Sequence, residues 1–179
     1  MRTIKQIHLM GIVFAAALVV GGVMALGTGS RGWKDSATKQ NSLPIEIQAA
    51  VLDALVGAEG EYAAYATYAA ILEEYGEVNP FANIVASEAK HIDALKQILE
   101  RYGVPYPVEN PYLGMIEAPQ SLAEAAQAGV DEEIANIAFY ETQLGAVADY
   151  LDIHDVFVNL YAASLSQHLP AFERAAARY

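Results

Sequence analysis

Four segments of the chain repeat apolar side chains at alternating steps of three and four residues, which is the pattern of a helix that buries one face. They span residues 45–75, 80–102, 120–150 and 154–178. The connections between them are short, long and short, and they contain Gly, Pro or Asp. This order predicts two antiparallel helical hairpins joined by a long crossover, and therefore an all-α four-helix bundle.

An apolar segment without charge precedes the predicted bundle. Residues 9–26 contain no charged side chain, and they follow a basic stretch that carries Arg2 and Lys5. Such a segment is typical of the core of a signal peptide or of a short membrane-spanning helix. We therefore expect the chain to be exported, with a signal peptide or membrane anchor over residues 1–27.

A polar linker rich in Gly and Ser follows over residues 28–44, and the bundle is expected over residues 45–179. If the anchor is retained, its basic N-terminal flank places the bundle on the outer face of the membrane. Cleavage after Gly27 would instead give a secreted or periplasmic protein.

Charge and cysteine content exclude several kinds of site. The chain has 22 acidic and 10 basic residues and a net charge of −12, which argues against a nucleic-acid partner. It has no cysteine, so disulfides and thiolate sites for zinc or iron–sulfur clusters are excluded. Any metal ion must be held by carboxylates and imidazoles.

Each of the four predicted core-facing stripes contains a titratable side chain where an apolar one is expected. These residues are Glu61 in the first helix, Glu88 and His91 in the second, Glu133 in the third and His168 in the fourth. Burying three carboxylates costs several kcal/mol per ion unless each is paired, and no Lys or Arg lies in the stripes. Metal ions would supply the missing positive charge.

The spacing of Glu88 and His91 also suits a metal, because a Glu and a His three residues apart present an oxygen and a nitrogen from one helical turn. Mixed carboxylate and imidazole ligation favours iron or manganese, and zinc is also compatible. If the helix phases differ by one or two residues, Glu59 would replace Glu61 and Glu132 would replace Glu133.

The titratable residues recur as an internal repeat. The sequence EYAAYATY at 61–68 matches EIANIAFY at 133–140, and SEAKHIDAL at 87–95 matches SLSQHLPAF at 164–172.

Two further features accompany the repeat. Tyr68 and Tyr140 each follow a Glu of the stripe by seven residues; they are either donors or radical carriers beside a metal, or core aromatics with satisfied hydroxyls. Pro170 should kink the fourth helix close to His168.

The chain resembles the ferritin-like di-iron carboxylate superfamily, and in particular the uncharacterised ferritin-like family named domain of unknown function 2202. The resemblance covers residues 45–175 and is strongest in EEYGEVNPFANIVASEAKHIDALKQILERYGVPYPV. It implies that Glu61 and Glu133 are terminal metal ligands, that Glu88 bridges, and that His91 and His168 are the nitrogen ligands. Where full di-iron proteins have a second bridging Glu, this chain has Leu165. The resemblance therefore leaves open whether the centre holds one iron ion or two.

The resulting expectation is an exported ferritin-like metal-binding protein, with iron as the metal and with ferroxidase or oxygen- or peroxide-linked redox chemistry implied by the resemblance. The sequence leaves open whether the protein is an enzyme and whether it forms a homodimer. The alternative is a metal-free helical binding module at the cell envelope, whose acidic surface and Tyr-rich hairpins recognise a partner.

Overall fold

The computed structural model describes residues 42–179, so the expected export segment and most of the expected linker lie outside the described residues. The regular secondary structure of the described part is entirely helical, with no strand. Its elements are α1 (Ile45–Val56), α2 (Glu61–Tyr75), α3 (Phe81–Arg101), α4 (Leu122–Leu144), α5 (Leu151–Ala163), a π-helical turn η1 (Ser164–His168) and α6 (Leu169–Ala176). None of the described helices is long and apolar enough to cross a membrane.

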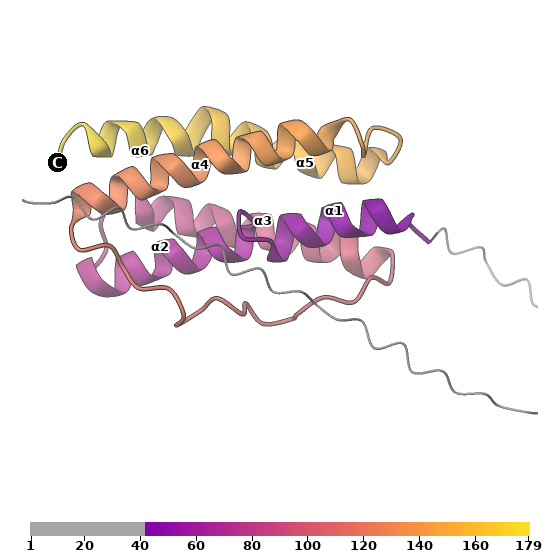
Figure 1. Cartoon of the computed structure of the whole chain (residues 1–179), viewed down its shortest axis with the longest axis horizontal. Coiled ribbons are helices and arrows are strands. Elements are labelled where there is room, and N and C mark those ends of the chain that lie inside the picture. The colour runs from indigo at the N-terminus through magenta and orange to yellow at the C-terminus, as the bar shows by residue number, and fades with distance from the viewer. Residues whose placement is uncertain (1–41) are drawn as a thin grey trace, which may run out of the picture. The chain divides into compact units, whose positions relative to one another are not determined.

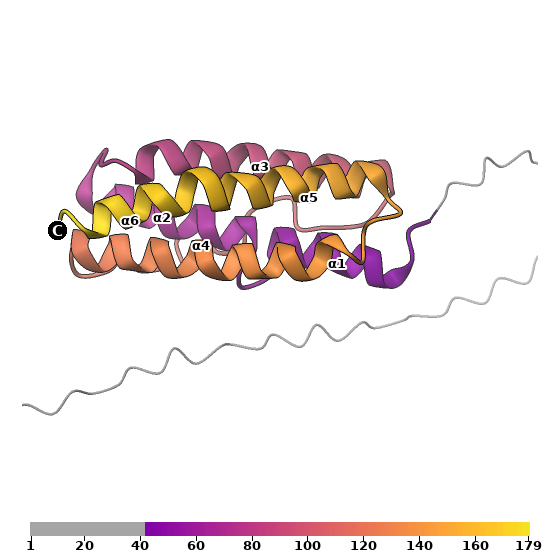
Figure 2. The same ribbon diagram turned by 90° about the horizontal axis from the view of Figure 1, so that it is seen from above.

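These elements form a bundle of four rods. Helices α1 and α2 lie end to end as one rod, α3 and α4 are each a rod, and α5, η1 and α6 continue one another as the fourth (Figures 1 and 2). Helix α3 packs along both α1 and α2, and α4 packs along α5, η1 and α6. The two predicted hairpins are therefore present in an all-helical bundle.

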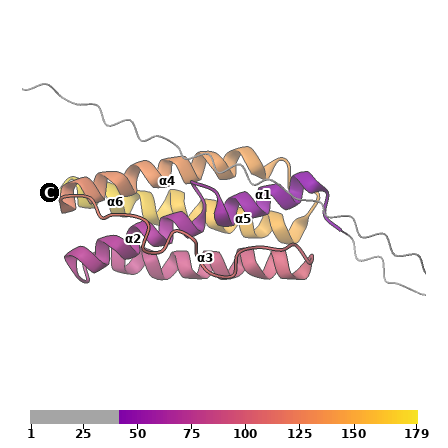
Figure 3. The ribbon, with the colours of Figure 1, turned by 60° about the horizontal axis from the view of Figure 1, so that its bottom comes forward.

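The crossover of residues 102–121 runs along the bundle over α1 and α2 (Figure 3). Side chains at several points hold it there. The Tyr62 hydroxyl donates to the carbonyl oxygen of Pro107 at 2.7 Å, and the Tyr112 hydroxyl donates to that of Val56 at 2.7 Å. The long connection is thus a fixed part of the fold.

The first and third predicted helices differ from those in the structure. The first predicted helix is interrupted at residues 57–60, between α1 and α2. A Cβ atom on Gly60 would lie 2.8 Å from the carbonyl oxygens of Asp53 and Ala54, so the chain turns closely here and requires a glycine. The third predicted helix ends at Leu144 rather than near residue 150, and a turn with Gly145 leads into α5.

The fourth helix starts earlier than expected, at Leu151, for an electrostatic reason. Asp152 lies in the first turn of α5, where the helix dipole favours a negative charge. Its carboxylate also accepts a hydrogen bond from Arg101 at 2.7 Å and from the Tyr102 hydroxyl at 3.0 Å. The end of α3 therefore fixes the beginning of α5.

The core-facing stripe of the fourth rod also differs from the prediction before His168. Steps of three and four counted back from His168 place Leu165, Tyr161 and Val158 in this stripe, but Leu165 is 43% exposed and Ser164 is only 3% exposed. The buried residues of the rod are Ile153, Phe157, Leu160, Ala163, Ser164, His168, Phe172 and Ala175. The π-helical turn explains the difference, because its wider turn shifts the helix phase by about one residue relative to an α-helix.

Pro170 gives a physical reason for a π turn at this point. A proline lacks the backbone N–H and crowds the carbonyl one turn before it, so a regular α-helix is weakened there. The irregularity expected near His168 is therefore a π turn over Ser164–His168.

Apolar side chains fill the two ends of the bundle. One cluster includes Val51, Leu55, Leu95, Leu99 and Phe157, and the other includes Tyr68, Ile71, Phe81, Ile84 and Phe172. Gly129 of α4 lets α6 approach closely, since a Cβ atom there would lie 2.6 Å from the ring of Phe172. The buried polar side chains of the bundle belong to neither cluster.

Candidate metal centre

The structure brings all five residues proposed from the sequence as metal ligands together inside the bundle. Each rod contributes: Glu61 is the first residue of α2, Glu88 and His91 lie on α3, Glu133 lies on α4 and His168 ends η1. All five side chains are buried. In each of the four rods, the titratable residue predicted from the sequence therefore lies on the side that faces the core.

The five side chains form two groups that share Glu88. In one group, the Nδ1 atom of His91 lies 2.8 Å from Oε2 of Glu88 and 3.2 Å from Oε2 of Glu61. In the other, Nδ1 of His168 lies 3.0 Å from Oε1 of Glu88 and 3.4 Å from Oε1 of Glu133. Within each group the potential ligand atoms all lie within 4.8 Å of one another. Each oxygen of Glu88 therefore faces a different histidine.

Tyr68 and Tyr140 connect the two hairpins across this centre. The Tyr68 hydroxyl on α2 donates to Oε1 of Glu133 on α4 at 2.9 Å, and the Tyr140 hydroxyl on α4 donates to Oε1 of Glu61 on α2 at 2.6 Å. Burial raises the pKa of both phenols well above its usual value, and the nearby carboxylates add to the rise. Both tyrosines are core aromatics whose protonated hydroxyls donate to the site.

The two histidines have different surroundings. Nε2 of His91 lies 3.3 Å from the Ser87 hydroxyl, which gives its second ring nitrogen a partner. Nδ1 of His168 is buried and makes no hydrogen bond within the described residues, although the two carboxylates lie close. The imidazole rings stack at 5.5 Å between centroids with 22° between their planes. The nitrogen of His168 thus points between carboxylates without a satisfied hydrogen bond.

Protons accumulate in this cluster when no metal is bound. Burial, with the nearby Glu88 carboxylate, raises the pKa of Glu61 to about 8. Burial alone would lower the pKa of both histidines, but contacts with Glu61 and Glu88 raise that of His91 to about 10, and contacts with Glu133 and Glu88 raise that of His168 to about 9. Burial would raise the pKa of Glu88, but His168, His91 and Glu61 hold it well below its usual range.

The donor set fits a metal. Three carboxylates and two imidazoles converge, and the buried polar residues of the described part include no Lys or Arg that could neutralise them. In the metal-free centre, protons on Glu61, His91 and His168 neutralise the negative charge instead. Nδ1 of His168 makes no hydrogen bond within the described residues and would be a ligand once the ring is neutral, and buried polar atoms without partners are uncommon.

The two alternative residues do not join either group. Glu59 is exposed, and Glu132 is half-buried beside the centre. Burial raises the pKa of Glu132 to about 8, and the negative charges of Glu59 and Glu133 contribute. Of each pair of alternatives, Glu61 and Glu133 are the residues that belong to the two groups.

Two buried polar residues at the centre were missed from the sequence. Asn136 on α4 and Ser164 in η1 are buried, and the Ser164 hydroxyl donates to Oδ1 of Asn136 at 2.9 Å. Asn136 follows Glu133 by three residues, as His91 follows Glu88, and this spacing could have identified it. Ser164 was hidden by the π turn, because Pro170 indicated an irregularity near His168 but not the phase shift that buries Ser164.

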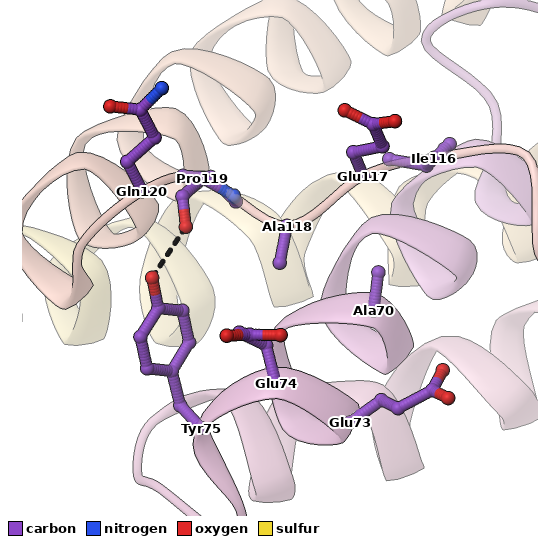
Figure 4. A pocket seen from close by; sticks show the side chains of 9 residues that line it. All are labelled: Ala70, Glu73, Glu74, Tyr75, Ile116, Glu117, Ala118, Pro119 and Gln120. Atoms are coloured by element: carbon purple, nitrogen blue, oxygen red, sulfur yellow. Dashed lines mark hydrogen bonds between the residues drawn. The ribbon is translucent and has the colours of Figure 1, made fainter.

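A surface pocket of about 490 Å³ lies away from this centre, between the end of α2 and the end of the crossover (Figure 4). Glu73, Glu74 and Glu117 are among its lining residues, and none of the five residues of the centre lines it. The Tyr75 hydroxyl donates to the carbonyl oxygen of Pro119 at 2.5 Å beside it (Figure 4). The pocket is formed where the crossover attaches to α2.

Comparisons with known proteins agree with the resemblance to one family. Residues 54–155 match the model of the uncharacterized protein domain DUF2202, a range that contains Glu61, Glu88, His91 and Glu133 and ends before His168. The chain is 33% identical over 108 residues to the uncharacterized protein MJ0754 of Methanocaldococcus jannaschii. That match covers 52% of this chain and 57% of the relative, so it spans little more than half of the relative's length.

The fold also matches a solved structure. The crystal structure of the hypothetical protein MJ0754 from Methanococcus jannaschii DSM 2661 superposes with a TM-score of 0.66 at 28% sequence identity. The superposition covers 76% of this chain and 83% of that one. With the family match extending over more than half of its sequence, the chain belongs to the DUF2202 family.

Proposed function

We propose that the bundle is a ferritin-like metal-binding domain that holds two metal ions, one on each side of Glu88. The observation that carries this proposal is the position of the Glu88 carboxylate. Its Oε2 atom faces His91 and its Oε1 atom faces His168, and each histidine has a further glutamate beside it. Glu88 would contribute to both positions, Glu61 and His91 would hold one ion with it, and Glu133 and His168 would hold the other.

The physical reason for a metal is the balance of charge. Three buried carboxylates without a basic partner are costly, and the metal-free centre offsets this cost only by holding protons. Iron suits this set of oxygen and nitrogen donors, and manganese and zinc are alternatives. Bound iron would supply one-electron redox chemistry, which supports a ferroxidase or an oxygen- or peroxide-linked role.

Metal content of the purified full chain tests the proposal. The chain is loaded with Fe(II) without oxygen, desalted and assayed for metal per chain. Two ions per chain are expected for the unmodified protein, in agreement with the two groups of ligands. Glu88→Gln should lose both ions because both positions use this carboxylate. His91→Ala and His168→Ala should each lose one.

The matched control is Glu77→Gln, which removes the charge of an exposed glutamate in the turn between α2 and α3. It should leave the metal content unchanged. If the unmodified chain retains no metal, and chelators do not change its melting temperature, the proposal is wrong. That result would favour the metal-free binding module, whose partner should then remain bound during chelation.

Redox activity and location are separate parts of the proposal. Fe(II) oxidation with oxygen or peroxide, followed by absorbance, should be faster with the unmodified chain than with Glu88→Gln. The apolar segment over residues 9–26 supports export of the chain. Fractionation of producing cells should recover the protein in the membrane or outside the cytoplasm, and recovery in the cytoplasm would contradict export.

A further inference from the structure

Two rods of the bundle lose regular α-helical geometry beside the metal centre. The break at residues 57–60 ends directly before Glu61, the first residue of α2. The π turn Ser164–His168 ends on the other ligand, His168. Each irregular segment therefore determines where one proposed ligand points.

One buried side chain touches both irregular segments. The Nδ2 group of Asn136 donates to the carbonyl oxygen of Glu59 at 3.2 Å, two residues before Glu61. Its Oδ1 atom accepts a hydrogen bond from the Ser164 hydroxyl at 2.9 Å, four residues before His168. Asn136 is 5% exposed, so water competes little for either bond.

The place of Asn136 on α4 links a third ligand to the same contact. Asn136 follows Glu133 by three residues, so both side chains leave neighbouring turns of one continuous helix on the same face. Helix α4 is uninterrupted here, whereas the other two segments are not. It provides the fixed reference against which the break and the π turn are held.

We propose that Asn136 is a positioning residue that holds Glu61 and His168 in register with Glu133. This inference rests on the proposed function, because it assigns Asn136 a role in metal binding without contact to the metal. One amide group carries both connections, so the two metal positions depend on the same residue. Ser164 carries only the connection to the His168 side.

The other support of the break offers a matched control. The Tyr112 hydroxyl on the crossover donates to the carbonyl oxygen of Val56, the last residue of α1 before the break. Tyr112→Phe removes a hydrogen bond to the break while Asn136 and Ser164 stay in place. It should lower the melting temperature of the metal-free chain without changing metal affinity.

Cobalt titration of the full chain tests the proposal. Co²⁺ is the probe because its visible absorption reports the coordination at each position, and competition with a chelator gives the two affinities. Asn136→Leu should weaken both positions by about tenfold, as outer contacts of metal ligands commonly do. Ser164→Ala should weaken only the position that contains His168 and change only its part of the spectrum.

A purely structural role gives a different result. In that case both variants would lower the melting temperature of the metal-free chain and keep the affinities and spectrum of the unmodified protein, which would overturn the inference. If Asn136→Leu does not fold, Ser164→Ala still tests the inference. An unchanged Co²⁺ affinity at the metal position that contains His168 would then overturn it. A failure of the unmodified chain to bind Co²⁺ would overturn the proposed function as well, so the two failures are distinguishable.

Discussion

Loading the metal centre at pH 7 should release about three protons per chain. In the metal-free protein the pKa values of Glu61, His91 and His168 are about 8, 10 and 9, so each side chain holds a proton at pH 7. Metal ligation requires an ionised carboxylate and neutral imidazoles. The protons must therefore leave when both positions are filled.

The same pKa values give the energy of this exchange. Removing a proton at pH 7 costs about 1.4 kcal/mol for each unit by which the pKa exceeds 7, so each of the three protons opposes metal binding at this pH. Below pH 7 the product of the two binding constants should fall by about a thousandfold per pH unit.

Isothermal titration calorimetry in buffers of different protonation enthalpy measures the number of protons released. Glu61→Gln should release about one proton fewer than the unmodified chain, because a glutamine has no proton to lose at this position. A chain that fills both metal positions at pH 7 and releases one proton or fewer would refute the reasoning, since the buried side chains would then not hold the protons assigned to them.

Three further predictions concern stability. The metal-free chain should lose stability as the pH rises from about 5 to about 10, because Glu61, His91 and His168 all have a higher pKa in the folded than in the unfolded chain. The stabilising effect of the proton on Glu61 is complete below pH 4.5 and is lost by about pH 8, and that of the protons on the two histidines is complete below pH 6.5 and is lost by about pH 9 and 10. Melting temperatures should fall over this range, and metal loading should reduce the fall. Tyr140→Phe removes the donor to Glu61 and should cost about 1–3 kcal/mol in denaturant unfolding of the metal-free chain. Gly60→Ala should lower the free energy of unfolding by about 2 kcal/mol or more, because the added Cβ atom would meet backbone oxygens. Gly145→Ala is its control: the added Cβ atom would meet nothing within 4 Å, so the free energy of unfolding should change by less than about 1 kcal/mol.

The sequence predicted the uninterrupted part of the fold well. The stripe that steps of three and four predict for the second helix is buried in α3 from Phe81 to Ile98, because such steps describe an α-helix without irregularities. Its last member, Tyr102, lies just after the helix and is half-buried. The titratable residues could be found for the same reason, since each stands out against apolar neighbours. The hairpin order also followed from the lengths of the connections.

The interruptions were less visible. Gly57 and Gly60 lie in a segment that otherwise has helical periodicity, and only the close approach of the backbone shows why glycine is needed there. Asn136 carries no signal in the sequence as a metal ligand, and the two groups that it contacts lie 77 and 28 residues away in the sequence. Such contacts depend on the tertiary structure and leave no local periodicity.

Leu165 shows how much the π turn changes the interpretation of the centre. By sequence alignment of the two halves, Leu165 replaces a second bridging glutamate, and Leu165→Glu should then restore a ligand. In the structure Leu165 is 43% exposed while Ser164 occupies the buried position and is bonded to Asn136. We therefore expect Leu165→Glu to change neither the metal content nor, by more than about 0.5 kcal/mol, the stability.

Ser164→Glu is the informative counterpart of that substitution. It places a carboxylate at a position that is 3% exposed, so the metal-free chain should lose about 3 kcal/mol or more unless the new group is protonated. Metal loading should recover part of this loss, because the new carboxylate enters the bundle at the level of His168. If Leu165→Glu instead alters metal binding and Ser164→Glu is neutral, the phase shift assigned to the π turn is wrong, and the repeat in the sequence describes the centre better than the observed helix geometry does.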